Sequence, residues 1–227
     1  MRRNKPILIA LIAVCVSAAG AIFAKDQQPV TADDAVRLLK EGNKRFVTMR
    51  LEHPNLSAAR REAVAVEAQQ PFATVLGCSD SRVPVEEIFD RGIGDIFIIR
   101  VAGNVAMDSV VIGSVEYAAG HLGTPVIVVL GHTGCGAVKA AISGPPLEGS
   151  VREVQKKIEP VVSLVKKEHP DLKGDVLAIA VVKANMLQAK QDLLASSPEI
   201  THMAADGKIR ILTAVYDMET GAVEWVE

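Results

Sequence analysis

Beyond its first few residues the sequence lacks a basic block, an internal repeat and any long linker rich in Gly, Ser or Pro. The lack of a basic block argues against nucleic acid as a partner, because phosphate binding needs clustered Lys and Arg. The lack of repeats and linkers indicates one domain, for which 227 residues is an ordinary length. Hydrophobic residues make up 49% and charged residues 23%, which is typical of a globular protein.

The sequence also lacks an apolar run of the length that most membrane-spanning helices have. The longest apolar stretch, residues 7–22, follows the basic start MRRNKP and ends in small residues before the polar stretch that begins at Lys25. This order predicts a secretory signal peptide over residues 1–24, with cleavage after Ala24 or Ala21. A single membrane anchor is the alternative, although roughly 17 uncharged residues is at the short limit for a span. We therefore expect a mature domain of residues 25–227 that is periplasmic or secreted and has no stable membrane insertion.

Cysteine is scarce as well. Removal of residues 1–24 takes away Cys15 and leaves Cys78 and Cys135. It also removes three bases and no acid, which changes the formal net charge from −2 to −5. In an oxidising compartment, two cysteines are compatible with a single disulfide. Whether they form one must be judged from the residues around each of them.

Short apolar runs alternate with helical patterns along the rest of the chain. Thr31 is a plausible N-cap of a first helix, with acids in the first turn and bases near the end. Near-continuous apolar strands that alternate with helices predict an α/β fold with a mostly parallel central sheet, helices on both faces and a C-terminal strand hairpin. The expected strands are 71–77, 95–100, 125–132, 208–217 and 222–226, and the expected helices are 31–47, 109–123, 151–168 and 176–197.

Three potential metal ligands lie where two of these strands end. Cys78 directly follows one apolar run, and His132 ends another, with Cys135 three positions later. Ligands collect at the carboxyl ends of parallel strands, so these side chains can meet if the two strands are neighbours. Thiolate and imidazole are the ligands that Zn²⁺ prefers, and three protein ligands suit a catalytic site with one open position.

The motifs CSDSR at 78–82 and HTGC at 132–135 resemble those of the β-class carbonic anhydrases. The resemblance covers nearly the whole mature chain, from LLKEGNKRF at 38–46 to YDMETGAVEWV at 216–226. It implies one Zn²⁺ per subunit held by Cys78, His132 and Cys135, and an adjacent dyad of Asp80 and Arg82. It also disfavours a disulfide, which would leave the acid, the arginine and the histidine without a role.

The implied activity is the reversible hydration of carbon dioxide to bicarbonate and a proton. Zinc acidifies a bound water and so supplies hydroxide near neutral pH, which attacks CO₂. Asp80 is expected to orient that water by accepting its hydrogen bond. Arg82 grips the carboxylate with two donors and keeps it from binding the metal. A closed state with Asp80 as fourth zinc ligand stays open.

The resemblance also suggests substrate-binding residues. Gln69, Phe97 and Tyr117 match pocket positions that relatives take from a neighbouring subunit, which implies a homodimer or higher homo-oligomer. Gly136 offers its N–H to bicarbonate, although a helix start would equally explain it. Ordinary packing is the alternative explanation for Phe97 and Tyr117. His121, four positions after Tyr117, is compatible with a proton relay or with a plain surface histidine.

The sequence leaves two other functions open. Relatives with the same zinc set hydrolyse carbon disulfide or carbonyl sulfide, and they differ mainly in access to the pocket. A non-enzymatic zinc-stabilised binding module would need a fourth fixed ligand, for which Asp80 is the nearby candidate. The sequence departs from some bacterial relatives in one respect, since Val75 stands where they carry a tryptophan of a non-catalytic bicarbonate site. Arg100 of that site is retained, and we expect no strong bicarbonate inhibition through it.

Overall fold

The computed structural model describes residues 30–226, so the predicted signal peptide lies outside the described residues. None of the described helices is both long and apolar enough to cross a membrane. The strands are β1 (Ala73–Gly77), β2 (Ile96–Arg100), β3 (Val126–His132), β4 (Arg210–Tyr216) and β5 (Val223–Val226). The helices are α1 (Ala32–Val47), α2 (Ala58–Glu67), α3 (Val85–Ile88), α4 (Ser109–Glu116), α5 (Gly136–Ser143), α6 (Val151–Glu168), α7 (Gly174–Ser196) and α8 (Pro198–Ala205), with short helical turns at Ala102–Asn104 and Tyr117–His121.

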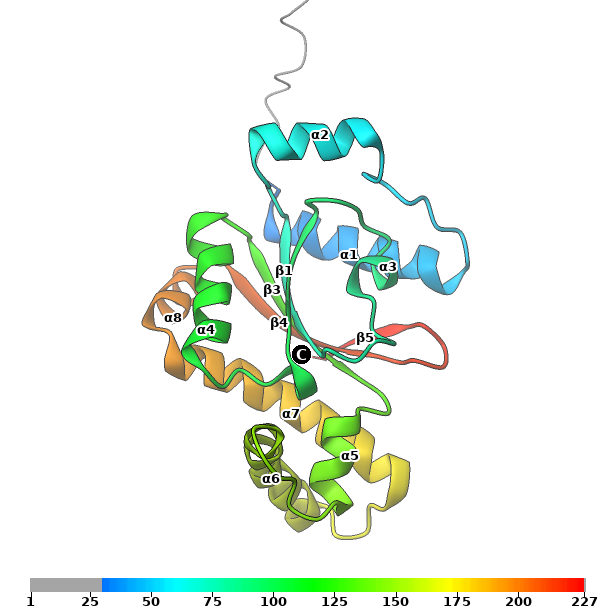
Figure 1. The fold of residues 1–227 in the computed structure, drawn as a ribbon, viewed down its shortest axis with the longest axis vertical. Coiled ribbons are helices and arrows are strands. Elements are labelled where there is room, and N and C mark those ends of the chain that lie inside the picture. Colours follow the sequence, from blue (N-terminus) through cyan, green and yellow to red (C-terminus); the bar gives the residue numbers. More distant parts are fainter. Residues whose placement is uncertain (1–29, 227) are drawn as a thin grey trace, which may run out of the picture.

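The strands form one sheet in the order β2-β1-β3-β4-β5. The first four run parallel, and β5 pairs antiparallel with β4 through a tight turn. The predicted α/β class, the mostly parallel sheet and the C-terminal hairpin are therefore confirmed. Figure 1 shows α1 and α3 on one side of the sheet and α4, α7 and α8 on the other.

Two apolar cores explain why the central strands read as continuous hydrophobic runs. Along β3, Ile127 and Val129 face the core under α7, while Val126, Val128 and Leu130 face the core under α1. All five side chains are fully buried. Because successive side chains of a strand point to opposite faces, burial on both faces requires apolar residues at every position.

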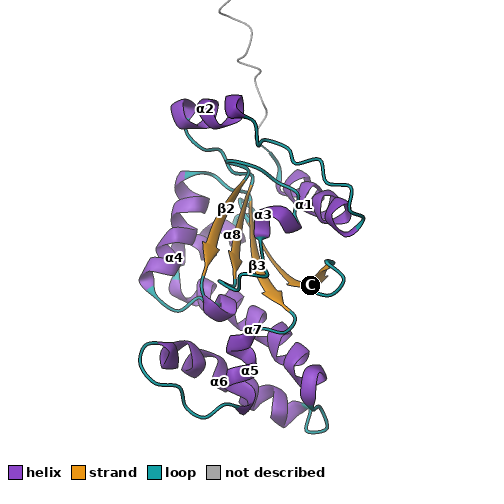
Figure 2. Cartoon of the chain, turned by 45° about the vertical axis from the view of Figure 1, so that its right-hand side comes forward, coloured by secondary structure: helices purple, strands orange, loops and turns teal. Residues whose placement is uncertain are grey.

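The N-terminal helix follows its sequence signals closely. The Thr31 hydroxyl accepts a hydrogen bond from the backbone N–H of Asp34 at 3.1 Å and so caps α1. Helix α2 was not expected from the sequence, and it contains no buried residue. It lies beyond the end of the sheet at which β1 begins, away from α5 and α6 (Figures 1 and 2).

Asp90 joins the end of α1 to the loop that follows it. Its carboxylate accepts hydrogen bonds from the Arg45 side chain and from the backbone N–H groups of Glu52 and His53. Burial raises the pKa of the Asp90 carboxyl, but these three hydrogen bonds together lower it below its usual range. The carboxylate therefore stabilises the fold at neutral pH.

We expect Asp90→Ala to lower the free energy of unfolding by about 3 kcal/mol, because two backbone amides lose their acceptor and the half-buried Arg45 keeps only the longer ion pair with exposed Glu52, at 3.6 Å, among its described ion pairs. Alanine also suits the positive φ of this residue poorly. Asp90→Asn, which tolerates that backbone, should cost less. The folded pKa is lowered, so the advantage of wild type over Asp90→Asn should be full above about pH 4 and shrink as the pH falls further. Urea unfolding at several pH values measures this, and a difference that grows on acidification would contradict it.

Candidate metal centre

Three potential ligands meet where β1 and β3 end. These strands are paired neighbours, with Gly77 opposite Leu130, so Cys78 and His132 emerge side by side. Cys135 follows at the N-cap of α5. One ligand atom from each of the three residues lies within 4.8 Å of the others, and all three side chains are buried. Both thiols are free, so the structure gives no support to a disulfide.

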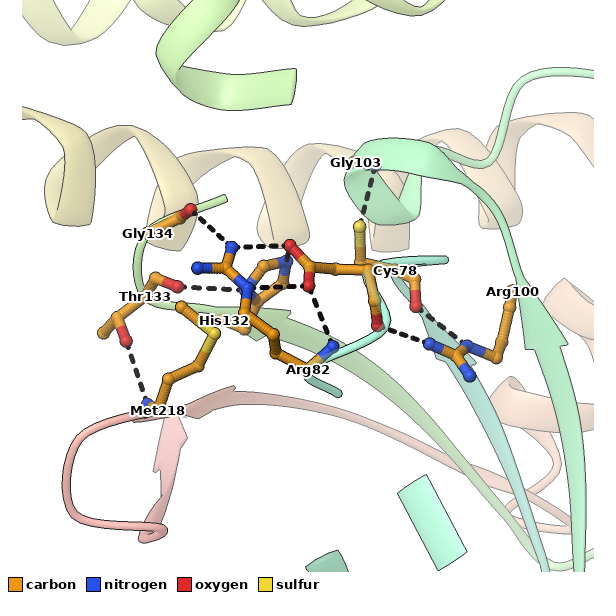
Figure 3. Close-up of polar contacts among 9 residues, drawn as sticks. Cys78, Arg82, Arg100, Gly103, His132, Thr133, Gly134 and Met218 are labelled. Atoms are coloured by element: carbon orange, nitrogen blue, oxygen red, sulfur yellow. Dashed lines mark hydrogen bonds and ion pairs between the residues drawn. The ribbon is translucent and has the colours of Figure 1, made fainter. Parts of the chain in front are cut away.

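The imidazole of His132 is oriented for metal binding. Its Nδ1 lies 2.9 Å from the carbonyl oxygen of Thr133, so Nδ1 carries the proton and donates it (Figure 3). The other nitrogen, Nε2, is buried and has no hydrogen-bond partner among residues 30–226. A buried polar atom without a partner is costly. A metal ion would use the free lone pair of Nε2, so this nitrogen and the two thiols fit one well.

The two thiols differ in their acidity. The hydrogen bond with Cys135 is the largest of the effects that lower the pKa of Cys78 to about 4, against the opposing effect of burial. The His132 side chain and the backbone N–H groups of Asp80 and Gly103 lower it further. Contact with Cys78 and burial raise the pKa of Cys135. The close contact of the two sulfurs therefore makes it unfavourable for both to be thiolates unless a cation lies beside them.

Asp80 and Arg82 form a two-pronged ion pair beside this cluster. The arginine Nε donates to Oδ1 of Asp80 at 2.9 Å, and its Nη2 donates to Oδ2 at 2.7 Å. The same Nη2 reaches the carbonyl oxygen of Gly134 at 3.3 Å, which ties the pair to the loop between His132 and Cys135 (Figure 3). These hydrogen bonds hold the pKa of Asp80 well below its usual range despite partial burial. Oδ2 of Asp80 lies 4.0 Å from Nε2 of His132, so an ionised carboxylate stands next to the site.

The expected pocket residues lie elsewhere in the same chain. Gln69 is exposed and precedes β1, at the opposite end of that strand from Cys78. Phe97 pairs with Thr74, four residues before Cys78, which places it roughly 13 Å along the sheet from the cysteine. Tyr117 packs against Phe97 with ring centroids 6.1 Å apart and is 47% exposed. A single chain therefore does not bring these three residues to its own metal cluster.

The two other candidates, Gly136 and His121, lie close to residues already named. Gly136 is the first residue of α5 and directly follows Cys135. A Cβ at this position would meet no atom within 4 Å, so packing within the chain does not require glycine here. The ring of His121 lies 5.4 Å from that of Tyr117, as their spacing suggested, although the chain forms a π-helical turn there.

Arg100 holds the loop of residues 78–80, directly after β1, by hydrogen bonds that the motif alone did not reveal. Its Nε donates to the carbonyl oxygen of Cys78 at 3.0 Å, and its Nη2 donates to that of Asp80 at 2.6 Å (Figure 3). The guanidinium is thus engaged by the loop, and Val75 is fully buried in β1. Both observations agree with our expectation that this chain lacks a strong bicarbonate site at these positions, which stays a prediction.

Buried cysteine and histidine side chains at the ends of parallel strands, with a carboxylate beside them, are typical of metal-dependent α/β enzymes. Comparison with known proteins narrows the class. The family model described as carbonic anhydrase matches residues 73–223, and the chain belongs to the β-carbonic anhydrase family.

Relatives and solved structures agree with this assignment. Carbonic anhydrase 2 of Mycobacterium tuberculosis is 40% identical over 191 residues, which cover 82% of this chain and 89% of the relative. The carbonic anhydrase of Mycolicibacterium smegmatis is 38% identical over 197 residues, which cover 81% and 95% of the two chains. The solved β-carbonic anhydrase CcaA superposes with a TM-score of 0.69 at 28% identity, over 85% of this chain and 95% of that one. The β-carbonic anhydrase CafA of Aspergillus fumigatus gives 0.69 at 25% identity, over 86% and 90%.

Proposed function

We propose that this chain catalyses the zinc-dependent, reversible hydration of carbon dioxide to bicarbonate and a proton. The observation that carries the proposal is the buried Nε2 of His132, which has no hydrogen-bond partner among the described residues and belongs to a cluster with two free thiols. One imidazole nitrogen and two sulfurs make a ligand set that binds Zn²⁺ in preference to harder divalent ions. When bound, zinc supplies hydroxide by acidifying a water molecule near neutral pH.

The chain's own residues then control the reacting water. Asp80 is ionised, so its carboxylate can only accept hydrogen bonds. It orients the reacting water by accepting a hydrogen bond from it. Arg82 occupies both carboxylate oxygens and holds them in place, with Oδ2 of Asp80 4.0 Å from Nε2 of His132. A carboxylate released from this grip would compete with water for the metal. We propose that Arg82 prevents that closed state.

We also propose that the active unit is a homodimer or a higher homo-oligomer. The positions of Gln69, Phe97 and Tyr117 support this, because each lies away from the metal cluster of its own chain. A second copy can supply them as pocket walls, and the exposed ring of Tyr117 is available for such a contact. The N–H of Gly136, at the open start of α5, is our candidate donor to bicarbonate.

Steady-state assays of the purified chain test the proposal. Rapid-mixing measurements of CO₂ hydration should show activity with about one zinc per chain, loss of activity after treatment with a chelator, and recovery when zinc is returned. The same samples are assayed with CS₂ as the control substrate. Turnover of CS₂ without CO₂ hydration would indicate the rival hydrolase. Full zinc occupancy with neither activity would indicate a zinc-stabilised binding module.

Export is a separate proposal, supported by the order of basic, apolar and small residues over 1–24. The mature protein should begin at Lys25 or Ile22 and should fractionate away from membranes. N-terminal sequencing of protein from the native host checks the cleavage site. Leu8→Arg, which interrupts the apolar run, should leave the chain uncleaved and inside the cell. Membrane-bound protein that retains residues 1–24 would favour an anchor instead.

A further inference from the structure

Helix α7 carries one polar residue on its otherwise apolar buried face, in the part of the chain that the structure describes. Asn185 is 3% exposed and lies among Val181, Val182, Met186 and Ala189. Burying an amide is unfavourable unless its polar atoms are hydrogen-bonded. A buried asparagine in such a helix therefore needs a hydrogen-bond partner.

Two successive hydrogen bonds connect Asn185 to the metal cluster. Its Nδ2 donates to the carbonyl oxygen of Gly103 at 2.9 Å, in a buried hydrogen bond. The N–H of Gly103 in turn donates to Sγ of Cys78 at 3.3 Å (Figure 3). Asn185 thus fixes the residue whose amide touches a metal-binding sulfur.

Gly103 has little freedom to take up another position. Its φ is +71°, a conformation that other residues rarely adopt. An added Cβ would lie 2.9 Å from Cδ1 of Ile158 and 3.2 Å from Cβ of Ala137, so α6 and α5 confine this residue from two sides. The third restraint is the hydrogen bond from Asn185.

The same face of α7 also fixes the second ligand strand. A Cβ on Gly131, the residue before His132, would lie 2.9 Å from Cγ1 of Val182 and 3.7 Å from Sδ of Met186. Asn185 and Met186 lie on the same face of the helix as Val182, because they follow it by three and four positions. The helix that holds Gly103 is therefore packed directly against the strand that delivers His132.

We propose that Asn185 is a positioning residue of the metal centre, which holds Gly103 so that its N–H donates to the Cys78 thiolate. The proposal rests on the proposed metal site. A hydrogen bond to a ligand sulfur partly neutralises the thiolate and restricts its movement, and contacts of this outer kind affect metal affinity about 10–100-fold. Loss of the Asn185 amide should loosen the Gly103 turn without removing any ligand.

The test compares Asn185→Leu with Asn43→Leu in the full mature protein. Asn43 is also buried and bonds to backbone groups, Ile88 and Gly221 among them, but it packs in the core on the opposite face of the sheet. Both variants lose a buried amide, and Asn43 makes three hydrogen bonds where Asn185 makes one, so Asn43→Leu should be destabilised at least as much as Asn185→Leu. With Co²⁺ as the probe metal, Asn185→Leu should shift the sulfur-to-cobalt charge-transfer absorption and release the metal to a chelator about 10-fold faster than wild type. Asn43→Leu should match wild type in both readouts.

Equal release rates and equal spectra for Asn185→Leu and wild type would overturn the proposal. Asn185→Ala is measured in parallel, because it removes the amide without adding volume. Wild type loaded with ¹¹³Cd gives a readout that needs no variant, since the Gly103 amide proton should show scalar coupling to the metal through the sulfur. Absence of that coupling in loaded protein overturns the positioning role alone. A wild type that binds neither metal overturns the metal site as well, so the two failures are distinguishable.

Discussion

Replacing Cys135 by serine is expected to empty the metal site and to lower CO₂ hydration by more than about 100-fold, beyond what loss of an outer contact costs. Serine offers a harder oxygen that stays protonated near neutral pH, so it is a poor zinc ligand. Cys135 stands at the N-cap position of α5, and its side chain makes no capping hydrogen bond there. Serine is a favoured N-cap and removes no cap when it replaces this cysteine, so the fold should persist.

Zinc content and thermal unfolding of Cys135→Ser separate these two effects. The variant should hold less than about a tenth of the wild-type zinc and should unfold like wild type stripped of metal by a chelator, since ligand loss removes the stabilisation by metal. Stripped wild type is the matched control, because it has the same ligands apart from the sulfur. Full zinc occupancy with normal hydration in Cys135→Ser would show that the metal site is assigned wrongly.

Replacing Arg82 by alanine should leave zinc in place and lower hydration by about 100-fold or more. Among the described residues, the carboxylate of Asp80 then keeps one hydrogen-bond donor, the N–H of residue 82, which lies 3.0 Å from Oδ1 in the wild type. Because Oδ2 lies 4.0 Å from Nε2 of His132, the freed carboxylate is near enough to compete for a metal ion that this nitrogen would hold. The carboxylate would then exclude the reacting water.

Adding Asp80→Ala to this variant removes the competing ligand. The double variant should therefore be more active than Arg82→Ala alone, whereas a simple catalytic pair gains nothing from losing both members. Arg82→Lys is the matched control, because it keeps the charge but loses the two-pronged grip, and it should fall between wild type and Arg82→Ala. A double variant no more active than Arg82→Ala, or loss of zinc from Arg82→Ala, would contradict the gating role.

The parallel core of the sheet could be predicted from the sequence because its strands are buried on both faces. Residues 126–130 had to be apolar at every position, and that pattern also predicts parallel strands whose carboxyl ends meet. The juxtaposition of Cys78 with His132 follows directly from the pairing of β1 with β3. Helix α2 was missed for the opposite reason, since it buries no side chain and leaves no periodic apolar signal.

Contacts made by backbone atoms were the part of the site that was hardest to predict from the sequence. Arg100 acts through two carbonyl oxygens and Gly103 acts through its N–H, and neither interaction depends on a side-chain spacing. Asn185 did leave a signal, as a lone amide on the buried face of an apolar helix. The roles of Gln69, Phe97 and Tyr117 stay predictions, because they depend on a second copy of the chain.

Zinc K-edge X-ray absorption of the purified mature protein tests the central claim most directly. The account predicts about two sulfur ligands near 2.3 Å, one imidazole nitrogen near 2.0 Å and one further light-atom ligand per zinc. In Cys135→Ser, any zinc that remains should have lost one sulfur ligand. A zinc ion surrounded only by nitrogen and oxygen in the wild type, or two sulfur ligands still present in Cys135→Ser, would contradict a metal centre built from Cys78, His132 and Cys135.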